Sequence, residues 1–195
     1  MKHEGWTSGE LSPAQVVSLG RYEELLMVQA VPRGMVAASD AGQLHTRHIL
    51  DSLRAVDHIS ARAERIVDLG SGAGLPGLPV AVARPDLEVT LAEPRQARAA
   101  FLELAVEMLR LPNVRVFPGP AEELASGFDV CLARGFGDAR RSWVAARDLL
   151  DPVGALVYWA GGTFRKGDTP PDARVRAIGE PTLESGGPIV IMTRQ

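Results

Sequence analysis

The chain has 195 residues, of which 46% are hydrophobic and 23% are charged, values that are ordinary for a globular protein. The formal net charge of −3 excludes a general electrostatic attraction to nucleic acid, so contact with RNA or DNA would need a local basic patch. No stretch approaches the roughly 18 consecutive apolar residues of a membrane span, and the N-terminus lacks the pattern of a signal peptide. We therefore expect a cytoplasmic protein without a membrane partner.

The first 62 residues form a predicted helical extension. Over 11–31, Ser12 precedes Pro13, which is the pairing of an N-cap with proline at the first helical position. A loop is predicted over 32–43, and an amphipathic helix over 45–59.

From residue 63 onward, predicted strands and helices alternate, which favours a parallel sheet covered on both faces. The predicted strands lie at 64–70, 87–93, 128–136 and 154–162, with a further strand and turn over 114–124, and the predicted helices lie at 75–85, 95–111 and 140–150. Two further strand-like runs, 175–181 and 188–194, follow with no helix between them, so they predict an antiparallel hairpin at one edge. The expected fold is α/β and Rossmann-like, with a seven-stranded mixed sheet over 63–195. That architecture is usual for methyltransferases that use S-adenosylmethionine (SAM).

The stretch VDLGSGAGLPGLPV (67–80) is a glycine-rich turn between a strand and a helix, a typical place for a nucleotide-like ligand. From Gly72 it matches the dinucleotide pattern G-x-G-x-x-G, and from Asp68 it matches the SAM pattern D-x-G-x-G-x-G. Glu93 ends the next strand and could accept hydrogen bonds from two ribose hydroxyls of either ligand. Asp68 would attract the positive charges of SAM but repel a pyrophosphate, so SAM is favoured.

The single cysteine, Cys131, lies in the apolar run VCLA, which predicts a buried, inert thiol. We expect no disulfide and no bound metal. The segment after the fourth strand lacks an N/D-P-P-Y/F motif, which disfavours methylation of an exocyclic amine. It contains Arg134, which could donate to a base, and Phe136, which could stack on one. The alternatives are a salt bridge for Arg134 and core packing for Phe136.

Four segments together resemble the RsmG/GidB family of bacterial small-subunit rRNA guanine-N7 methyltransferases. They are RHILDSL (47–53), the stretch 67–86, Glu93 with RAAFLE (98–103), and FDVCLARGFG (128–137). The resemblance implies SAM as the methyl donor and N7 of a guanine in rRNA, free or in the ribosomal particle, as the acceptor. Because N7 has a free lone pair, no general base is expected. We expect a monomer.

The resemblance also implies roles for residues that match the family motifs by position. For SAM binding these are Asp68, Gly70, Ser71, Gly72, Gly74, Leu75, Glu93, Ala121, Glu122 and Arg134. Arg134 is also expected to orient the substrate. On the substrate side they are His48, Asp51 and Ser52, which the helix could equally use for capping and packing. Apart from the resemblance, Phe136, Arg140, Arg165 and Lys166 are further candidates on the substrate side, with Arg165 and Lys166 able to substitute for a missing family lysine.

The chain departs from the family pattern at two places on the expected substrate side. The loop before Arg47 lacks the usual N-L-T-like segment, and Ala160 stands where the family tends to place a lysine. A SAM-dependent methyltransferase of a small molecule, or a non-catalytic protein that binds NAD or SAM, therefore remains an alternative.

Overall fold

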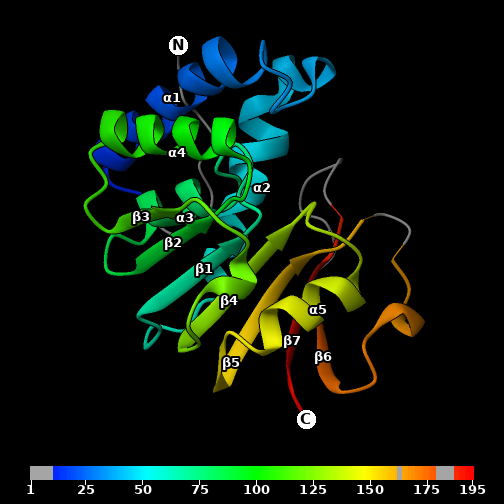
Figure 1. The fold of residues 1–195 in the computed structure, drawn as a ribbon. Coiled ribbons are helices and arrows are strands. Elements are labelled where there is room, and N and C mark those ends of the chain that lie inside the picture. The colour runs from blue at the N-terminus through cyan, green and yellow to red at the C-terminus, as the bar shows by residue number, and fades with distance from the viewer. Residues whose placement is uncertain (1–10, 162–163, 179–186) are drawn as a thin grey trace.

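The computed structural model describes residues 11–161, 164–178 and 187–195. In this part of the chain the strands are β1 (Arg65–Leu69), β2 (Glu88–Ala92), β3 (Val114–Phe117), β4 (Phe128–Arg134), β5 (Leu150–Trp159), β6 (Ala173–Ile178) and β7 (Ile189–Arg194) (Figure 1). The α-helices are α1 (Pro13–Leu25), α2 (Asp51–Leu53), α3 (Gly77–Ala83), α4 (Gln96–Leu109) and α5 (Ala139–Arg147). Short 3₁₀ turns cover Ala38–Gln43, Val56–His58, Ala121–Glu123 and Lys166–Asp168.

The strands form one sheet in the order β3-β2-β1-β4-β5-β7-β6. Strands β1 to β5 are parallel to one another, and β7 runs antiparallel to both β5 and β6. This topology confirms the predicted seven-stranded mixed sheet with an antiparallel pair at one edge. The order reverses between β1 and β4, which places a ligand site at the carboxyl ends of these two strands.

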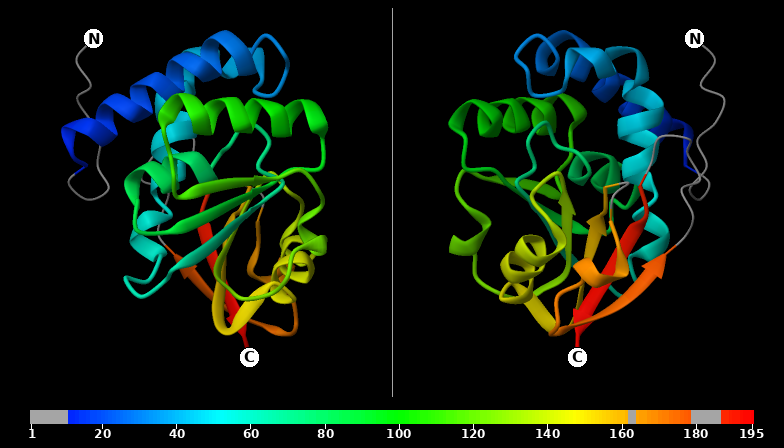
Figure 2. Two further views of the ribbon diagram at one scale, coloured as in Figure 1. Left: turned by 60° about the vertical axis from the view of Figure 1, so that its left-hand side comes forward. Right: turned by 90° about the vertical axis from the view of Figure 1, so that its right-hand side faces the viewer.

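Helices cover the two faces of the sheet unequally. Helices α1, α3 and α4 pack on one face, and α5 packs on the other (Figures 1 and 2). Alternation along β1 explains the two cores, because Ile66 faces the first group of helices and Val67 and Leu69 face α5. No helix of the described residues is long and apolar enough to cross a membrane.

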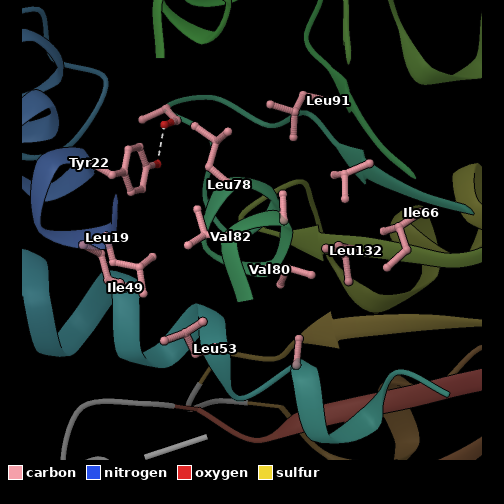
Figure 3. Close-up of a cluster of buried hydrophobic side chains, with 14 of the residues drawn as sticks. Leu19, Tyr22, Ile49, Leu53, Ile66, Leu78, Val80, Val82, Leu91 and Leu132 are labelled. Atoms are coloured by element: carbon pink, nitrogen blue, oxygen red, sulfur yellow. Dashed lines mark hydrogen bonds between the residues drawn. The ribbon is translucent and has the colours of Figure 1, made fainter. Parts of the chain in front are cut away.

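The N-terminal helices share the core of the sheet domain. Leu19 and Tyr22 of α1, with Ile49 and Leu53, are buried in the same cluster as Leu78 of α3 (Figure 3). Each buried apolar side chain of this size contributes about 1.5–3 kcal/mol. The helical extension therefore cannot separate from the sheet without exposing part of the core.

Polar contacts fix the start of α1 as the sequence predicts. Ser12 caps the helix, with Gln15 completing a capping box. The Gln15 side chain also donates to the carbonyl oxygens of Val82 (2.9 Å) and Ala83 (3.0 Å) at the end of α3. One glutamine thus ties the beginning of α1 to the end of α3.

Three predicted helices differ from those in the structure. Over 45–59, the chain forms a π-helical turn (Leu44–Leu50), then α2 and a 3₁₀ turn, because side chains bind the carbonyl oxygen of His48. A second π-helical turn, Leu26–Ala30, follows α1. The predicted helix 140–150 ends at Arg147, since Leu150 already pairs with Phe128 in the sheet.

Gly77 lies where α3 approaches β1 and β2 most closely. A Cβ atom there would lie 2.4 Å from Leu91 Cδ2 and 2.7 Å from Asp68 Oδ2. We expect Gly77→Ala to lower the free energy of unfolding by about 1–3 kcal/mol, the usual cost of overpacking. Gly42→Ala is the control, because nothing lies within 4 Å of its Cβ position. Urea denaturation of both variants checks this, and an equal effect would contradict it.

Candidate active site

A cleft of about 270 Å³ opens at the carboxyl ends of β1 and β4, where the sheet order reverses. The glycine-rich turn after β1 forms one wall, and residues of the N-terminal extension form another. The lining residues are Met35, Val36, Ala37, His48, Gly70, Ser71, Gly72, Ala73, Leu75, Arg98, Arg134 and Gly135. The structure therefore brings the predicted residues His48, Gly70, Ser71, Gly72, Leu75 and Arg134 to one cleft.

The turn after β1 keeps its backbone exposed to the cleft. Gly70, Gly72 and Gly74 all have positive φ angles, of 64°, 60° and 90°. The buried hydroxyl of Tyr22 donates to the carbonyl oxygen of Ala73 at 2.6 Å, so α1 anchors the turn from beneath (Figure 3). The turn is therefore held in place before any ligand binds.

Asp68, at the end of β1, is only 1% exposed. Its Oδ2 atom accepts the backbone N–H of Gly77 at 3.0 Å, whereas Oδ1 has no hydrogen-bond partner among the described residues. Burial raises the pKa of this carboxyl to about 7, although the hydrogen bond from Gly77, the nearby Ser71 hydroxyl and the positive charge of Arg134 lower it. A buried carboxylate with an unpaired oxygen is destabilising unless a cation compensates it.

Glu93 lies just beyond the end of β2 and is 3% exposed. Its Oε2 accepts the backbone N–H of Gly72 and its Oε1 that of Arg95, both at 2.9 Å. Arg98 Nη1 lies 4.0 Å from Oε2. Glu93 thus connects the turn after β1 to the start of α4, at the position expected for a ribose-binding acid.

Arg134, at the end of β4, is bound to the N-terminal extension. Its Nη1 donates to the carbonyl oxygen of His48 (3.2 Å) and to Ser52 Oγ (3.3 Å). Its Nη2 donates to the carbonyl oxygen of Arg47 (2.8 Å) and lies 3.4 Å from Asp51 Oδ2. The motif RHILDSL therefore surrounds one guanidinium. These contacts favour the salt-bridge interpretation of Arg134. Asp51 is its ionic partner, and Ser52 accepts a hydrogen bond from it.

His48 joins Arg134 to Asp40. Because Arg134 Nη2 can only donate, His48 Nδ1 (3.2 Å) is the acceptor, and its Nε2 carries the proton that Asp40 Oδ2 accepts at 3.1 Å. Burial, with the positive charges of Arg134 and Arg47, lowers the pKa of His48, although Asp40 opposes the shift. The structure thus requires a neutral imidazole.

We expect the wild-type protein to lose stability relative to His48→Asn as the pH falls below about 6.5. A histidine whose pKa is lower in the folded state than in the unfolded state stabilises the fold fully above its unfolded pKa. That contribution to the free energy of unfolding is lost as the pH falls and the imidazole becomes protonated. The asparagine side chain of the variant would offer an acceptor but could not titrate. Unfolding free energies at pH 7.5 and 5.5 test this, and parallel pH curves for both proteins would contradict it.

The other predicted residues do not line this cleft. Five of them are buried, namely Asp51, Ser52, Asp68, Gly74 and Glu93. Phe136 packs over Gly70, because a Cβ on Gly70 would lie 2.9 Å from Phe136 Cδ2. Ala121 is buried and Glu122 exposed on a 3₁₀ turn after β3. Arg140 lines a separate cleft, and Arg165 is hydrogen-bonded to Asp168 and Phe164. The side chain of Lys166 lies outside the described residues.

Sequence reasoning missed several residues around the cleft. Asp40 and Met35 lie in the loop that departs from the family pattern. Tyr22 lies in the helix that is predicted from the spacing of its apolar residues. A tyrosine among the apolar residues of α1 could have indicated a polar contact of that helix, because a buried hydroxyl usually has a hydrogen-bond partner.

The fold and the cleft together define the class of protein. A sheet of order 3-2-1-4-5-7-6, with a glycine turn after β1 and an acid after β2, is that of the class I SAM-dependent methyltransferases. The crystal structure of an MtNAS mutant in complex with S-adenosylmethionine superposes with a TM-score of 0.66 at 17% identity, covering 92% of this chain and 72% of that one. At this identity the likeness concerns the fold alone.

The chain belongs to the family of rRNA small subunit methyltransferase G (GidB), whose model matches residues 15–167. Ribosomal RNA small subunit methyltransferase G of Salinispora arenicola is 50% identical over 151 residues, covering 73% of this chain and 62% of the relative. The protein of the same name from Burkholderia thailandensis is 37% identical over 187 residues, covering 90% and 80%. Matches to the first curated relatives span 56–62% of their length.

Proposed function

We propose that this protein transfers a methyl group from SAM to N7 of a guanine in small-subunit rRNA. The observation that carries the proposal is the family match, because residues 15–167 include every residue that lines the cleft. The relatives are named for their action on small-subunit ribosomal RNA. The proposed setting is the cytoplasm, with a monomer acting on rRNA or the ribosomal particle, and with residues 1–62 as an extension of the methyltransferase domain at 63–195.

The residues present fit SAM as the cofactor. Asp68 Oδ1 is buried without a partner among the described residues, and a cationic group would compensate it. Gly70 and Gly72 line the cleft without side chains, which allows close approach of a ligand. Both Glu93 oxygens already accept a backbone N–H, but a carboxylate offers about four acceptor positions, so ribose hydroxyls can still donate to it.

Bound SAM would supply an electrophilic methyl group on a sulfonium sulfur. The work of the chain is then alignment and the exclusion of water, since displacement at the methyl carbon needs an in-line nucleophile. Met35, Val36 and Ala37 contribute apolar lining to the cleft, and Arg134 binds the carbonyl oxygens of Arg47 and His48 in the π-helical turn beside it. N7 attacks through its own lone pair, so no residue has to remove a proton.

The Glu93 assignment gives a prediction. We expect Glu93→Gln to weaken SAM binding about tenfold or more, because one acceptor oxygen becomes a donor that cannot bind a ribose hydroxyl in the same way. Calorimetric titration with SAM measures this. Glu103→Gln, on the exposed side of α4, is the control for the loss of one negative charge. Unchanged SAM affinity in Glu93→Gln would refute the ribose assignment.

Transfer of label from methyl-labelled SAM to small subunits or naked rRNA lacking the modification tests the function. We expect label at N7 of a guanine. If the label appears only in a small molecule, that molecule is the methyl acceptor and the RNA assignment is wrong. Tighter binding of NAD than of SAM, with no transfer, would favour the non-catalytic alternative.

A further inference from the structure

A second cleft, of about 210 Å³, lies at the carboxyl ends of β4 and β5. It is formed by the start of α5, the end of β5 and the segment 164–168. Its side chains are chemically mixed, with two aromatic rings, two carboxylates and one guanidinium, from Tyr158, Phe164, Asp138, Asp168 and Arg140. Pockets that enclose drug-sized ligands measure about 300–1,000 Å³, so this cleft suits a single planar base.

The two clefts are neighbours. Gly135 lines the first and Asp138 the second, and three residues span at most about 11 Å. The segment between them is fixed, because Phe136 packs over Gly70 and the Tyr158 hydroxyl donates to the carbonyl oxygen of Gly137 at 3.1 Å. The linings of the two clefts therefore approach each other to within about 11 Å along this segment.

Aromatic side chains give this cleft the character of a base-binding site. The rings of Tyr158 and Phe164 have centroids 6.4 Å apart and are tilted by 59°. Tyr158 is 6% exposed, whereas Phe164 is half-buried and is the more accessible of the two rings. Unpaired RNA bases stack on such rings, and each stacked base contributes about 1–3 kcal/mol.

The two carboxylates add selectivity. Asp138 caps α5 by accepting the backbone N–H of Arg141 at 2.8 Å, and Asp168 accepts that of Arg165 at 2.7 Å. Each carboxylate keeps further acceptor positions. Both line the cleft together with Tyr158, and their negative charges add to burial in raising the pKa of the Tyr158 hydroxyl.

We propose that the second cleft binds the acceptor base, a guanine, through its Watson–Crick edge. Guanine presents the donors N1–H and N2–H₂ side by side on that edge, which the carboxylates Asp138 and Asp168 can accept. N7 lies on the opposite edge and stays free for methylation. The exposed Arg140 guanidinium at the rim suits the adjoining phosphate. This inference rests on the proposed function and assigns its acceptor site to residues other than Arg134.

Two variants test the site through the kinetics of rRNA methylation. We expect Phe164→Ala and Asp138→Asn each to raise the KM for rRNA about tenfold or more, with the KM for SAM unchanged. Asparagine also caps helices well, so Asp138→Asn preserves the start of α5. Asp148→Asn, at the opposite end of the same helix, controls for charge and should leave both KM values unchanged. Wild-type kinetics in Asp138→Asn would overturn the inference and leave the proposed function standing.

Calorimetric titration with guanosine monophosphate and adenosine monophosphate, in the presence of S-adenosylhomocysteine, tests the site without turnover. We expect the wild-type protein to prefer the guanosine nucleotide, and Asp138→Asn to abolish the preference. Equal binding of both nucleotides, or a preference that survives in Asp138→Asn, would overturn the inference even if Phe164→Ala does not fold. Absence of methyl transfer to any RNA by the wild-type protein would instead overturn the proposed function.

Discussion

Asp68→Asn is expected to stabilise the ligand-free protein at pH 8 while weakening its affinity for SAM about tenfold or more. The carboxylate is fully buried, with Oδ1 unpartnered among the described residues, and burial raises its pKa to about 7 from 3.8. Each unit by which the pKa is raised corresponds to about 1.4 kcal/mol of destabilisation by the buried charge. Asparagine removes that cost, but its unpaired amide destabilises the variant by about 1–3 kcal/mol. We expect a net gain of roughly 1–3 kcal/mol.

The pH dependence of this gain has a defined sign. A carboxyl whose folded-state pKa is raised is most favourable below its unfolded pKa, near 4, and that advantage is lost as the pH rises towards 7. Asp68→Asn should therefore be less stable than the wild type by about 1–3 kcal/mol near pH 4, where only the unpaired amide counts, and more stable than the wild type above pH 7. Urea denaturation across this range measures it, with Glu103→Gln, at an exposed acid of α4, as the control.

The opposite result would have a clear meaning. If Asp68→Asn is less stable than the wild type at every pH, the hydrogen bond from Gly77 to Oδ2 outweighs the unpaired charge. Asp68 would then serve only to anchor the start of α3. If instead stability rises and SAM affinity is unchanged, Asp68 does not face a positive charge of the cofactor.

The strands and the glycine turn could be predicted because each depends on the residue types of a short stretch of sequence. Short apolar runs such as 128–134 are buried on both faces of a parallel sheet, and positive φ angles at Gly70 and Gly72 require glycine. The ends of elements were less predictable. The end of α5 at Arg147 depends on pairing between Leu150 and Phe128, which are far apart in the sequence.

The roles of the site residues could be predicted only in part. The sequence shows that Arg134 follows a strand and that Asp51 and Ser52 share a motif, but it cannot show that the motif binds the arginine. Asp40 lies in a loop without a recognisable pattern, and only the fold brings it to His48. Contacts between distant segments depend on how the helices pack, which local sequence does not encode.

Arg134→Ala is expected to lower the free energy of unfolding by about 3–5 kcal/mol, the cost of removing one member of a buried ion pair. The side chain is 18% exposed and its loss would leave Asp51 with only Arg54 (2.7 Å) as a charged partner among the described residues. It would also remove the donors to the carbonyl oxygens of Arg47 and His48. Arg140→Ala, at an exposed position, should change stability by less than about 0.5 kcal/mol.

Arg134→Lys separates charge from geometry. An ammonium on a flexible stem cannot reproduce the planar fork that serves Arg47, His48 and Ser52 together, so most of the stability loss should remain. Because Arg134 positions one wall of the cleft, SAM affinity should fall with stability in both variants. If Arg134→Ala instead keeps wild-type stability and SAM affinity but loses methyl transfer, the arginine acts on the acceptor base, and its contacts with the motif are incidental.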